Sequence, residues 1–388
     1  MKPNDYRKIQ EWLEDIIDEW ELDVIATISA RLFIYSKLTP QEKERLTLTL
    51  RQFDTITALE RKFDTLETIT TKIAEVVVDF TTRTDRALNN ELARKMGFDD
   101  LDEDLEYLQL AELLKRQSAD YLNGLTKGFI TRDNRFKSVK DAYLYECAML
   151  DAQGLEALPR CIEDISSRGV VTYNPTDNRV TDIGAEYKRQ VTHTVEQITN
   201  ANAEQMQEFF GTDYVEVTAH YGARPTHAVW QGKVYKVHGS EPGYPNLYEA
   251  TQLGEGVGLK GWNCRHDYFP FVMGVSERQY TDQELVNMLP ENNKFTFNGK
   301  EYDGYTSTQR QRAYERRIKR HRRKMVGLDA IGDKEGFRKE AYALRQIQKE
   351  YEEFSKTAKL PMQTDRMQVE GFTSDINKRM WAVLNKGL

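Results

Sequence analysis

The sequence predicts an α+β protein with a helical N-terminal half, a small β-rich α+β module and a helical, basic C-terminal tail. Three observations carry this expectation. Apolar residues before residue 210 recur at three- and four-residue steps, the period of an amphipathic helix. Alternating runs and a hairpin signal occupy residues 211–305. A block of cations at helical spacing then follows residue 306.

The N-terminal half opens with an apolar stripe on one helix face, made of Ile9, Trp12, Leu13, Ile16, Ile17 and Trp20. Pro40 interrupts the pattern, because proline lacks the backbone N–H that a helix interior needs. A second stripe occupies residues 59–80, and Gly97 ends it beside an acidic stretch at residues 99–106. We therefore expect a helical region over residues 1–130.

A helical connector is predicted over residues 131–210. Helical patterns lie at residues 108–125, 139–165 and 183–198, so the first of these precedes the connector. Residues 170–173 look like a short strand, followed by a turn at Asn174-Pro175.

The hydrophobic pattern changes from helical to strand-like in residues 211–305, the predicted α+β module. Residues 214–220 alternate as a strand does, and residues 228–230 and 233–235 read as a hairpin around Gln231-Gly232. Residues 266–271 are a further predicted strand, and Thr281 can open a short helix. The strongest signal is Asn298-Gly299 between two aromatic runs, because this pair suits a type I′ hairpin turn.

The tail, residues 306–388, is predicted to be helical again. Thr306 and Gln309 have capping-box spacing, and a helix over residues 306–324 would span about 28 Å. Nine cations cover most of this helix: Arg310, Arg312, Arg316, Arg317, Lys319, Arg320, Arg322, Arg323 and Lys324. Further helices are expected at residues 337–354 and, after Pro361, at residues 375–384.

The basic helix has two interpretations. It can lie along the phosphates of a nucleic acid, with an affinity that falls steeply as salt rises. It can instead pair with an acidic surface, either that of a partner or the protein's own residues 99–106. Nothing in the helix would read base sequence, and the net charge of −7 argues against a chain that coats nucleic acid as a whole.

Composition excludes several classes of protein. No run of 18 apolar residues is present, so a membrane-spanning helix is not expected. The first residues lack the apolar core of a secretory signal. Three cysteines are too few for a disulfide framework, which favours a reducing cytoplasm. We therefore expect a protein made and assembled inside a cell, without a membrane.

Four residues of the module form a candidate metal site: His220, His227, Cys264 and His266. Their side chains suit zinc, the one cofactor that the sequence suggests. On a strand, Cys264 and His266 would point to the same side. Two alternatives remain open. These residues can simply pack and hydrogen-bond in a β-rich core, or Cys264 can act as a nucleophile with a histidine base. The second lacks an identifiable third group, so no catalytic residue is assigned.

A glycine-rich loop precedes Cys264, where Gly256, Gly258 and Gly261 match the spacing G-x-G-x-x-G. A dinucleotide site would need a helix to open on this loop, whereas a strand-like run follows it. The glycines are better explained by positive φ angles or a close approach of the backbone.

Two segments of the module and one of the tail resemble the phage minor capsid protein 2 family. They are residues 215–233 (VEVTAHYGARPTHAVWQGK), residues 258–266 (GLKGWNCRH) with the following Phe-Pro-Phe and Gly274, and residues 305–318 around YTSTQRQR and ERRI. The Asn-Cys-Arg-His group is also similar to the Asn-Cys-Arg-Cys ending of Mu F-like head morphogenesis proteins, with His266 in place of the second cysteine.

The resemblance implies a structural minor head protein of a tailed phage. Such a protein would be present in few copies near the portal and would assist head assembly and DNA packaging or ejection. Its expected partners are the portal protein, the major capsid protein and packaged DNA; its expected locations are the virion and, during assembly, the host cytoplasm. The alternative is a virion-delivered enzyme, a metal-dependent nuclease or a transferase, that uses the His/Cys cluster.

Overall fold

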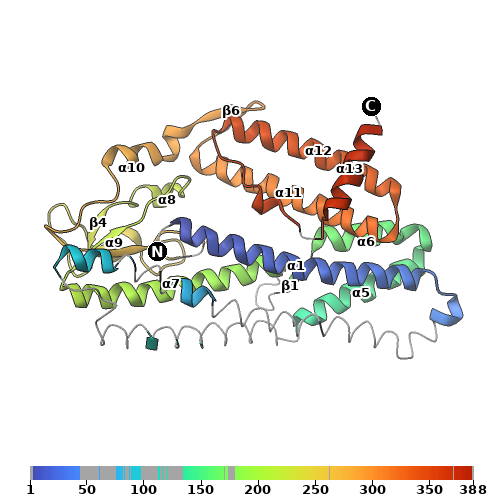
Figure 1. The fold of residues 1–388 in the computed structure, drawn as a ribbon, viewed down its shortest axis with the longest axis horizontal. Helices are drawn as coiled ribbons and strands as arrows, with labels where there is room; N and C mark the ends of the chain where they lie inside the picture. The colour runs from blue at the N-terminus through green and yellow to red at the C-terminus, as the bar shows by residue number, and fades with distance from the viewer. Residues whose placement is uncertain are drawn as a thin grey trace. The chain divides into compact units, whose positions relative to one another are not determined.

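The computed structural model describes residues 3–43, 76–81, 83, 87, 89–97, 134–169, 171–173, 180–261, 263–369 and 371–386, with single positions at 61, 112, 113, 116 and 120. The chain divides into two compact units. Unit 1 comprises Met1–Gln10, Thr70–Leu125 and Lys188–Arg310, and unit 2 comprises Glu11–Ile69, Thr126–Tyr187 and Gln311–Leu388. Long helices and a few small antiparallel sheets confirm the predicted α+β class (Figure 1).

Some sequence predictions fall outside the described residues. These are the acidic stretch at residues 99–106, most of the stripe at residues 59–80, most of the pattern at residues 108–125, the turn at Asn174-Pro175, and Trp262. None of the described helices is both long and apolar enough to cross a membrane.

A three-stranded antiparallel sheet forms the centre of unit 1. It contains β3 (Tyr214–Val217), β4 (Val234–Lys236) and β5 (Tyr268–Phe271) in the order β4-β3-β5. Val215 lies opposite Tyr235 on β4 and Pro270 on β5. Pro270 is tolerated because β5 is an edge strand. Helix α7 (Ile183–Phe210) packs Ala203 into the same core.

The predicted strand at residues 228–230 is wrong. This segment forms α8 (Pro225–Ala228) and the turn that follows it, so β4 pairs with β3 instead. Pro225 stands in the first turn of α8, where its fixed φ favours a helix. The N–H groups of Trp230 and Gln231 both donate to the carbonyl of His227, which continues the helical turn.

The second half of unit 1 follows the predicted turn chemistry. Strands β6 (Phe295–Phe297) and β7 (Lys300–Tyr302) form the expected hairpin. Asn298 and Gly299 have φ angles of 48° and 75°, the two positive values that a type I′ turn requires. Thr281 and Glu284 form a capping box at the start of α10 (Asp282–Met288). A short 3₁₀ helix, η2 (Pro290–Asn293), links α10 to β6, and α9 (Leu247–Thr251) precedes the glycine-rich loop.

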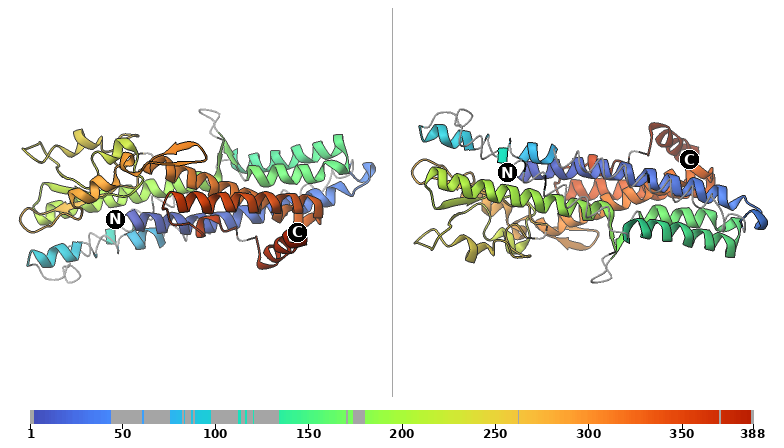
Figure 2. Two further views of the ribbon diagram at one scale, coloured as in Figure 1. Left: turned by 90° about the horizontal axis from the view of Figure 1, so that it is seen from above. Right: turned by 90° about the horizontal axis from the view of Figure 1, so that it is seen from below.

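The predicted helix over residues 139–165 is interrupted in unit 2. It forms α5 (Asn134–Gln153), a 3₁₀ turn η1 (Leu155–Ala157) and α6 (Leu158–Arg168), with α5 and α6 side by side (Figure 2). Gly154 has a φ of 79°, which ends α5, and proline at the start of α6 favours a new helix. The predicted strand β1 (Val171–Tyr173) is present and pairs with β2 (Val180–Asp182).

The other described helices of unit 2 are most of α1 (Pro3–Ser36), most of α11 (Gly304–Ile331), α12 (Lys334–Thr357), η3 (Asp365–Met367) and α13 (Ser374–Lys386). Tyr314 on α11 packs against Tyr351 and Phe354 on α12, with ring centroids 6.2 Å and 5.6 Å apart.

The start of α11 differs from the predicted one. The helix begins at Gly304, because Asp303 and Thr306 hydrogen-bond each other's backbone N–H in the reciprocal manner of a capping box. The capping pair is therefore Asp303 and Thr306 and not the predicted pair of Thr306 and Gln309.

Candidate metal centre

The histidine and cysteine cluster of unit 1 is assembled from two segments that are distant in the sequence. His227 comes from α8, whereas Cys264 and His266 lie in the segment that leads into β5. This segment extends the pairing of β3 with β5, because the N–H of Thr218 donates to the carbonyl of Asp267 and the N–H of Asp267 donates to Thr218 Oγ1, both at 2.8 Å. The sheet therefore positions Asp267, the residue next to His266, and Cys264 is held by the loop through its N–H bond to the Gly261 carbonyl.

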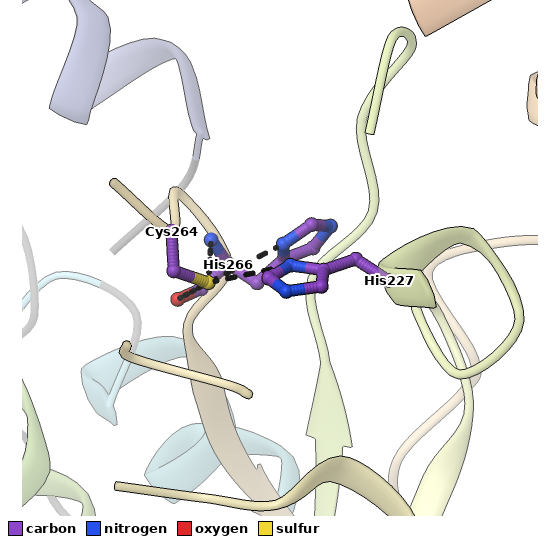
Figure 3. Close-up of side chains that lie close together, drawn as sticks. All are labelled: His227, Cys264 and His266. Atoms are coloured by element: carbon purple, nitrogen blue, oxygen red, sulfur yellow. Dashed lines mark hydrogen bonds between the residues drawn. The ribbon is translucent and has the colours of Figure 1, made fainter. Parts of the chain in front are cut away.

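Three side chains converge on one point, as Figure 3 shows. Cys264 Sγ lies 3.6 Å from Nδ1 of His266 and 3.8 Å from Nδ1 of His227. One potential ligand atom from each of the three residues lies within 4.8 Å of the others. His227, Cys264 and His266 are 2%, 1% and 1% exposed, so the cluster is shielded from solvent.

Hydrogen bonds at the far side of each imidazole define which ring nitrogen carries the proton. His227 Nε2 lies 2.8 Å from the carbonyl oxygen of Val257, which can only accept, so Nε2 is the donor. His266 Nε2 lies 2.9 Å from Gln231 Oε1. That Gln231 atom must be the oxygen, because it also accepts from the backbone N–H of His220 at 3.1 Å.

Both Nδ1 atoms that face the sulfur are consequently unprotonated in neutral rings. Burial lowers the pKa of His227, and burial together with the nearby histidines and arginines lowers that of His266 well below its usual value. Hydrogen bonding of the outer nitrogen to a carbonyl is the arrangement that orients histidine ligands of metals.

Burial also shapes the chemistry of Cys264. It raises the pKa of the thiol to about 11, although backbone hydrogen bonds from His266 and Lys260 act in the opposite direction. The N–H of His266 donates to Sγ at 3.4 Å. The sulfur is therefore a protonated thiol when no cation is near, with donors already placed to stabilise a thiolate.

The glycine-rich loop holds Cys264 in place through close contacts of its backbone. A Cβ atom on Gly258 would lie 2.0 Å from the carbonyl oxygen of Gln252, and one on Gly261 would lie 2.2 Å from that of Glu255. Positive φ angles occur instead at Lys260 and Asn263. Of the two explanations offered for these glycines, close approach of the backbone applies at Gly258 and Gly261.

A buried ion pair joins the same loop to the segment before β5, and a hydrogen bond from the same lysine joins the loop to α7. Lys260 Nζ lies 2.5 Å from Asp267 Oδ1 and donates to Thr199 Oγ1 at 2.7 Å. The Lys260 and Asp267 side chains are 2% and 0% exposed.

His220, the fourth residue of the predicted metal set, lies beside the cluster rather than in the group of three. Its ring stacks on that of His266 with centroids 4.4 Å apart, and its Nδ1 lies 3.0 Å from the carbonyl oxygen of Tyr221. Gln231 and the Val257 carbonyl, which orient the two histidine rings of the cluster, were missed. No sequence signal identifies them, because pairing across 30 or more positions depends on the fold.

The predicted nucleic-acid residues lie along α11, and the structure divides them into three groups. Arg322, Arg323 and Lys324 are held within unit 2: Arg323 pairs with Glu21, Arg322 bonds the Met367 carbonyl, and Lys324 lies 3.4 Å from Glu340. Arg310, Arg312 and Lys319 are half-buried. Arg316, Arg317 and Arg320 are exposed.

Comparison with known proteins places the chain in a family. The sequence profile of the family described as phage minor capsid protein 2 matches residues 1–356. A structural protein of Lactococcus phage LL-H is 30% identical over 125 residues, which cover 30% of this chain and 29% of that protein. A structural protein of Lactococcus phage mv4 is 28% identical over 110 residues, 28% of this chain and 76% of that protein.

The match to the LL-H protein therefore spans less than a third of that relative's length. No solved structure matches the chain. The profile match covers most of the sequence, and it agrees with the resemblance seen in residues 215–233 and 258–266. The chain belongs to the phage minor capsid protein 2 family and is a structural protein of a phage.

Proposed function

We propose that this chain is a portal-proximal minor head protein, in contact with the portal and the major capsid protein, that assists head assembly and DNA packaging or ejection. The observation that carries the DNA-related part is the exposed arginine group of α11: Arg316, Arg317 and Arg320. Ion pairs of Arg323 and Lys324 with Glu21 and Glu340 fasten the following turns of the same helix. The exposed guanidinium groups are thus displayed on a fixed support, as phosphate binding requires.

The alternative of a virion-delivered nuclease or transferase is less favoured. Either reaction needs the catalytic groups to reach a substrate, whereas His227, Cys264 and His266 are each at most 2% exposed. The burial raises the pKa of Cys264, which also opposes its use as a nucleophile.

The location is tested on purified particles. Mass spectrometry of dissociated virions should detect the chain at a copy number far below that of the major capsid protein, and chemical cross-linking should join it to the portal. Absence from the particles would reject the proposal.

The role of the arginines is tested in a phage that depends on this chain. The variant Arg316→Glu, Arg317→Glu, Arg320→Glu should assemble heads that contain less DNA. A matched variant with the same charge change on α12, at the exposed positions Arg338, Lys339 and Lys349, should package normally. Equal DNA content in both variants would show that the arginine group has no part in packaging.

A further inference from the structure

We propose that His227, Cys264 and His266 bind one zinc ion through two imidazole Nδ1 atoms and one thiolate, and that the ion stabilises this part of unit 1. The proposal stands on the local geometry and does not depend on the role of the chain in the virion.

The donor spacing fits zinc. With Zn–S near 2.3 Å and Zn–N near 2.0–2.1 Å, tetrahedral angles place sulfur and nitrogen about 3.5 Å apart. The two distances from Cys264 Sγ to Nδ1 of His266 and His227 are 3.6 Å and 3.8 Å. The three donor atoms lie within 4.8 Å of one another, so the two imidazoles would have to draw closer by up to roughly 1.4 Å to meet at one ion.

The cluster has one S–H donor for two Nδ1 acceptors, so one acceptor lacks a donor, and a cation can take the place of the missing donor. Cys264 has one S–H proton and can donate it to one Nδ1 at a time. The second bare Nδ1 then faces the lone pairs of the sulfur, inside a site shielded from water. A divalent cation satisfies both imidazoles and the sulfur together. The S–H proton is released to solvent on binding, so the site changes from a neutral thiol with two neutral imidazoles to a complex with net charge +1.

The surroundings are arranged for a bound metal. The Val257 carbonyl and Gln231 Oε1 accept from the two outer nitrogens, and the N–H of His266 donates to the sulfur. If these residues only packed in a core, the two inner nitrogens would have no need to face the sulfur. Thiolate and imidazole donors favour zinc over magnesium or calcium, which prefer oxygen.

The ion would link segments that are 37 positions apart, His227 of α8 and Cys264 before β5. Between them lie β4, α9 and the glycine-rich loop. Burial of all three donors favours a structural ion over a catalytic one, because a substrate would have no access. Bulk solvent is excluded, so the fourth position of the tetrahedron would be filled by one water molecule trapped with the ion.

The first test uses the full-length wild-type protein. Purified from medium that contains zinc, it should carry about one equivalent of zinc by elemental mass spectrometry. After removal of zinc by a chelator, cobalt(II) should produce the strong visible bands of tetrahedral coordination and a thiolate-to-cobalt charge-transfer band in the near ultraviolet. Folded protein with far less than one equivalent of zinc and no such bands would overturn the proposal.

Variants test the ligand set. Cys264→Ser should lose the charge-transfer band, and His266→Gln should lose the bound metal. The matched control is His238→Ala, because His238 is an exposed histidine of the same unit that pairs with Asp213. It should keep one equivalent. His220→Ala should also keep the metal, and loss of zinc from this variant would contradict a site of three residues.

A labelling measurement covers the case in which a variant fails to fold. In the wild-type protein under partly denaturing conditions, zinc should slow alkylation of Cys264 at least tenfold, while Cys147 and Cys161, which lie in unit 2, serve as internal references. Equal rates for Cys264 with and without zinc would show that the sulfur is not a ligand.

Discussion

Glu216, on β3, has a fully buried carboxyl group. Its Oε1 accepts from the backbone N–H of Gln279 at 2.8 Å. Burial nevertheless raises the pKa of Glu216 to about 7 from the usual 4.5, because the backbone bond and the nearby Arg278 only partly offset it. The folded protein therefore holds a proton here that the unfolded chain releases, over a window of roughly pH 4.5 to 7.

Because the folded protein keeps this proton, we expect Glu216→Gln to change the free energy of unfolding in a pH-dependent way. As pH rises through the window, the unfolded chain ionises first, so the wild type loses stability relative to the neutral variant. The variant should match the wild type near pH 4 and exceed it by on the order of 2 kcal/mol at pH 8. Urea unfolding of both proteins across this range checks the prediction, and a stability difference that does not change with pH would contradict it.

A second prediction at the scale of one residue concerns the contribution of Lys260 to stability. Lys260→Met should destabilise the protein by up to roughly 3–5 kcal/mol, because the buried Asp267 carboxylate would lose its ion pair with Lys260. The double variant Lys260→Met, Asp267→Asn should recover part of the loss. Chemical unfolding measures both, with Lys339→Met on the exposed side of α12 as the control. A single variant as stable as this control would show that the pair is dispensable.

At the scale of an element, the glycine-rich loop needs glycine where the backbone passes too close to another segment for a Cβ atom to fit, and not for a positive φ angle. Gly261→Ala should cost more than 2 kcal/mol, because the added Cβ meets the backbone oxygen of Glu255, which cannot rotate away. Gly239→Ala is the contrast: its φ is 76° but nothing lies within 4 Å of the added atom, so about 1 kcal/mol is expected. Thermal unfolding of the two variants distinguishes steric conflict from strain, and equal losses would argue against the close approach.

The cations of helix α11 include some that pair within unit 2 and others that are exposed to solvent. Glu21, Glu163 and Glu340 each lie within 4 Å of a cation on its later turns, so these cations serve unit 2 itself. These partners differ from the acidic stretch at residues 99–106, which lies outside the described residues, so pairing with that stretch stays a prediction. The arginines at positions 316, 317 and 320 are exposed, and the proposed contact with DNA rests on them.

At the scale of the whole molecule, the net charge of −7 opposes contact with DNA, so binding must depend on the local arginine group. Binding of duplex DNA by the full chain should weaken steeply as salt rises. The variant Arg316→Ala, Arg317→Ala, Arg320→Ala should lower the slope of log affinity against log salt by roughly 3, about 0.9 for each lost phosphate contact. A filter-binding titration measures the slope, and the α12 variant with alanines at 338, 339 and 349 should leave it unchanged. No binding at low salt would remove DNA from the list of partners.

Much of the fold was predictable from local chemistry. The Asn298-Gly299 hairpin, the capping box of Thr281 and strand β3 depend on residues close in sequence, and all three are present. The errors occurred where distant pairing decides the outcome. Residues 228–230 alternate like a strand, yet β3 takes β4 and β5 as its partners and leaves them to a helical turn. The predicted divisions at residues 130, 210 and 305 stay predictions.

The sequence by itself determined the fold class, the family and the types of residue available for a metal, because these follow from period, motif and side-chain chemistry. Only the tertiary structure decided that His227, Cys264 and His266 meet, that His220 stacks beside them, and that Gln231 and Val257 orient the rings. It also separated the buried cations of α11 from the exposed ones. The physical reason is the same in each case: hydrogen bonds and burial join groups tens of residues apart, and no local pattern records which groups will meet.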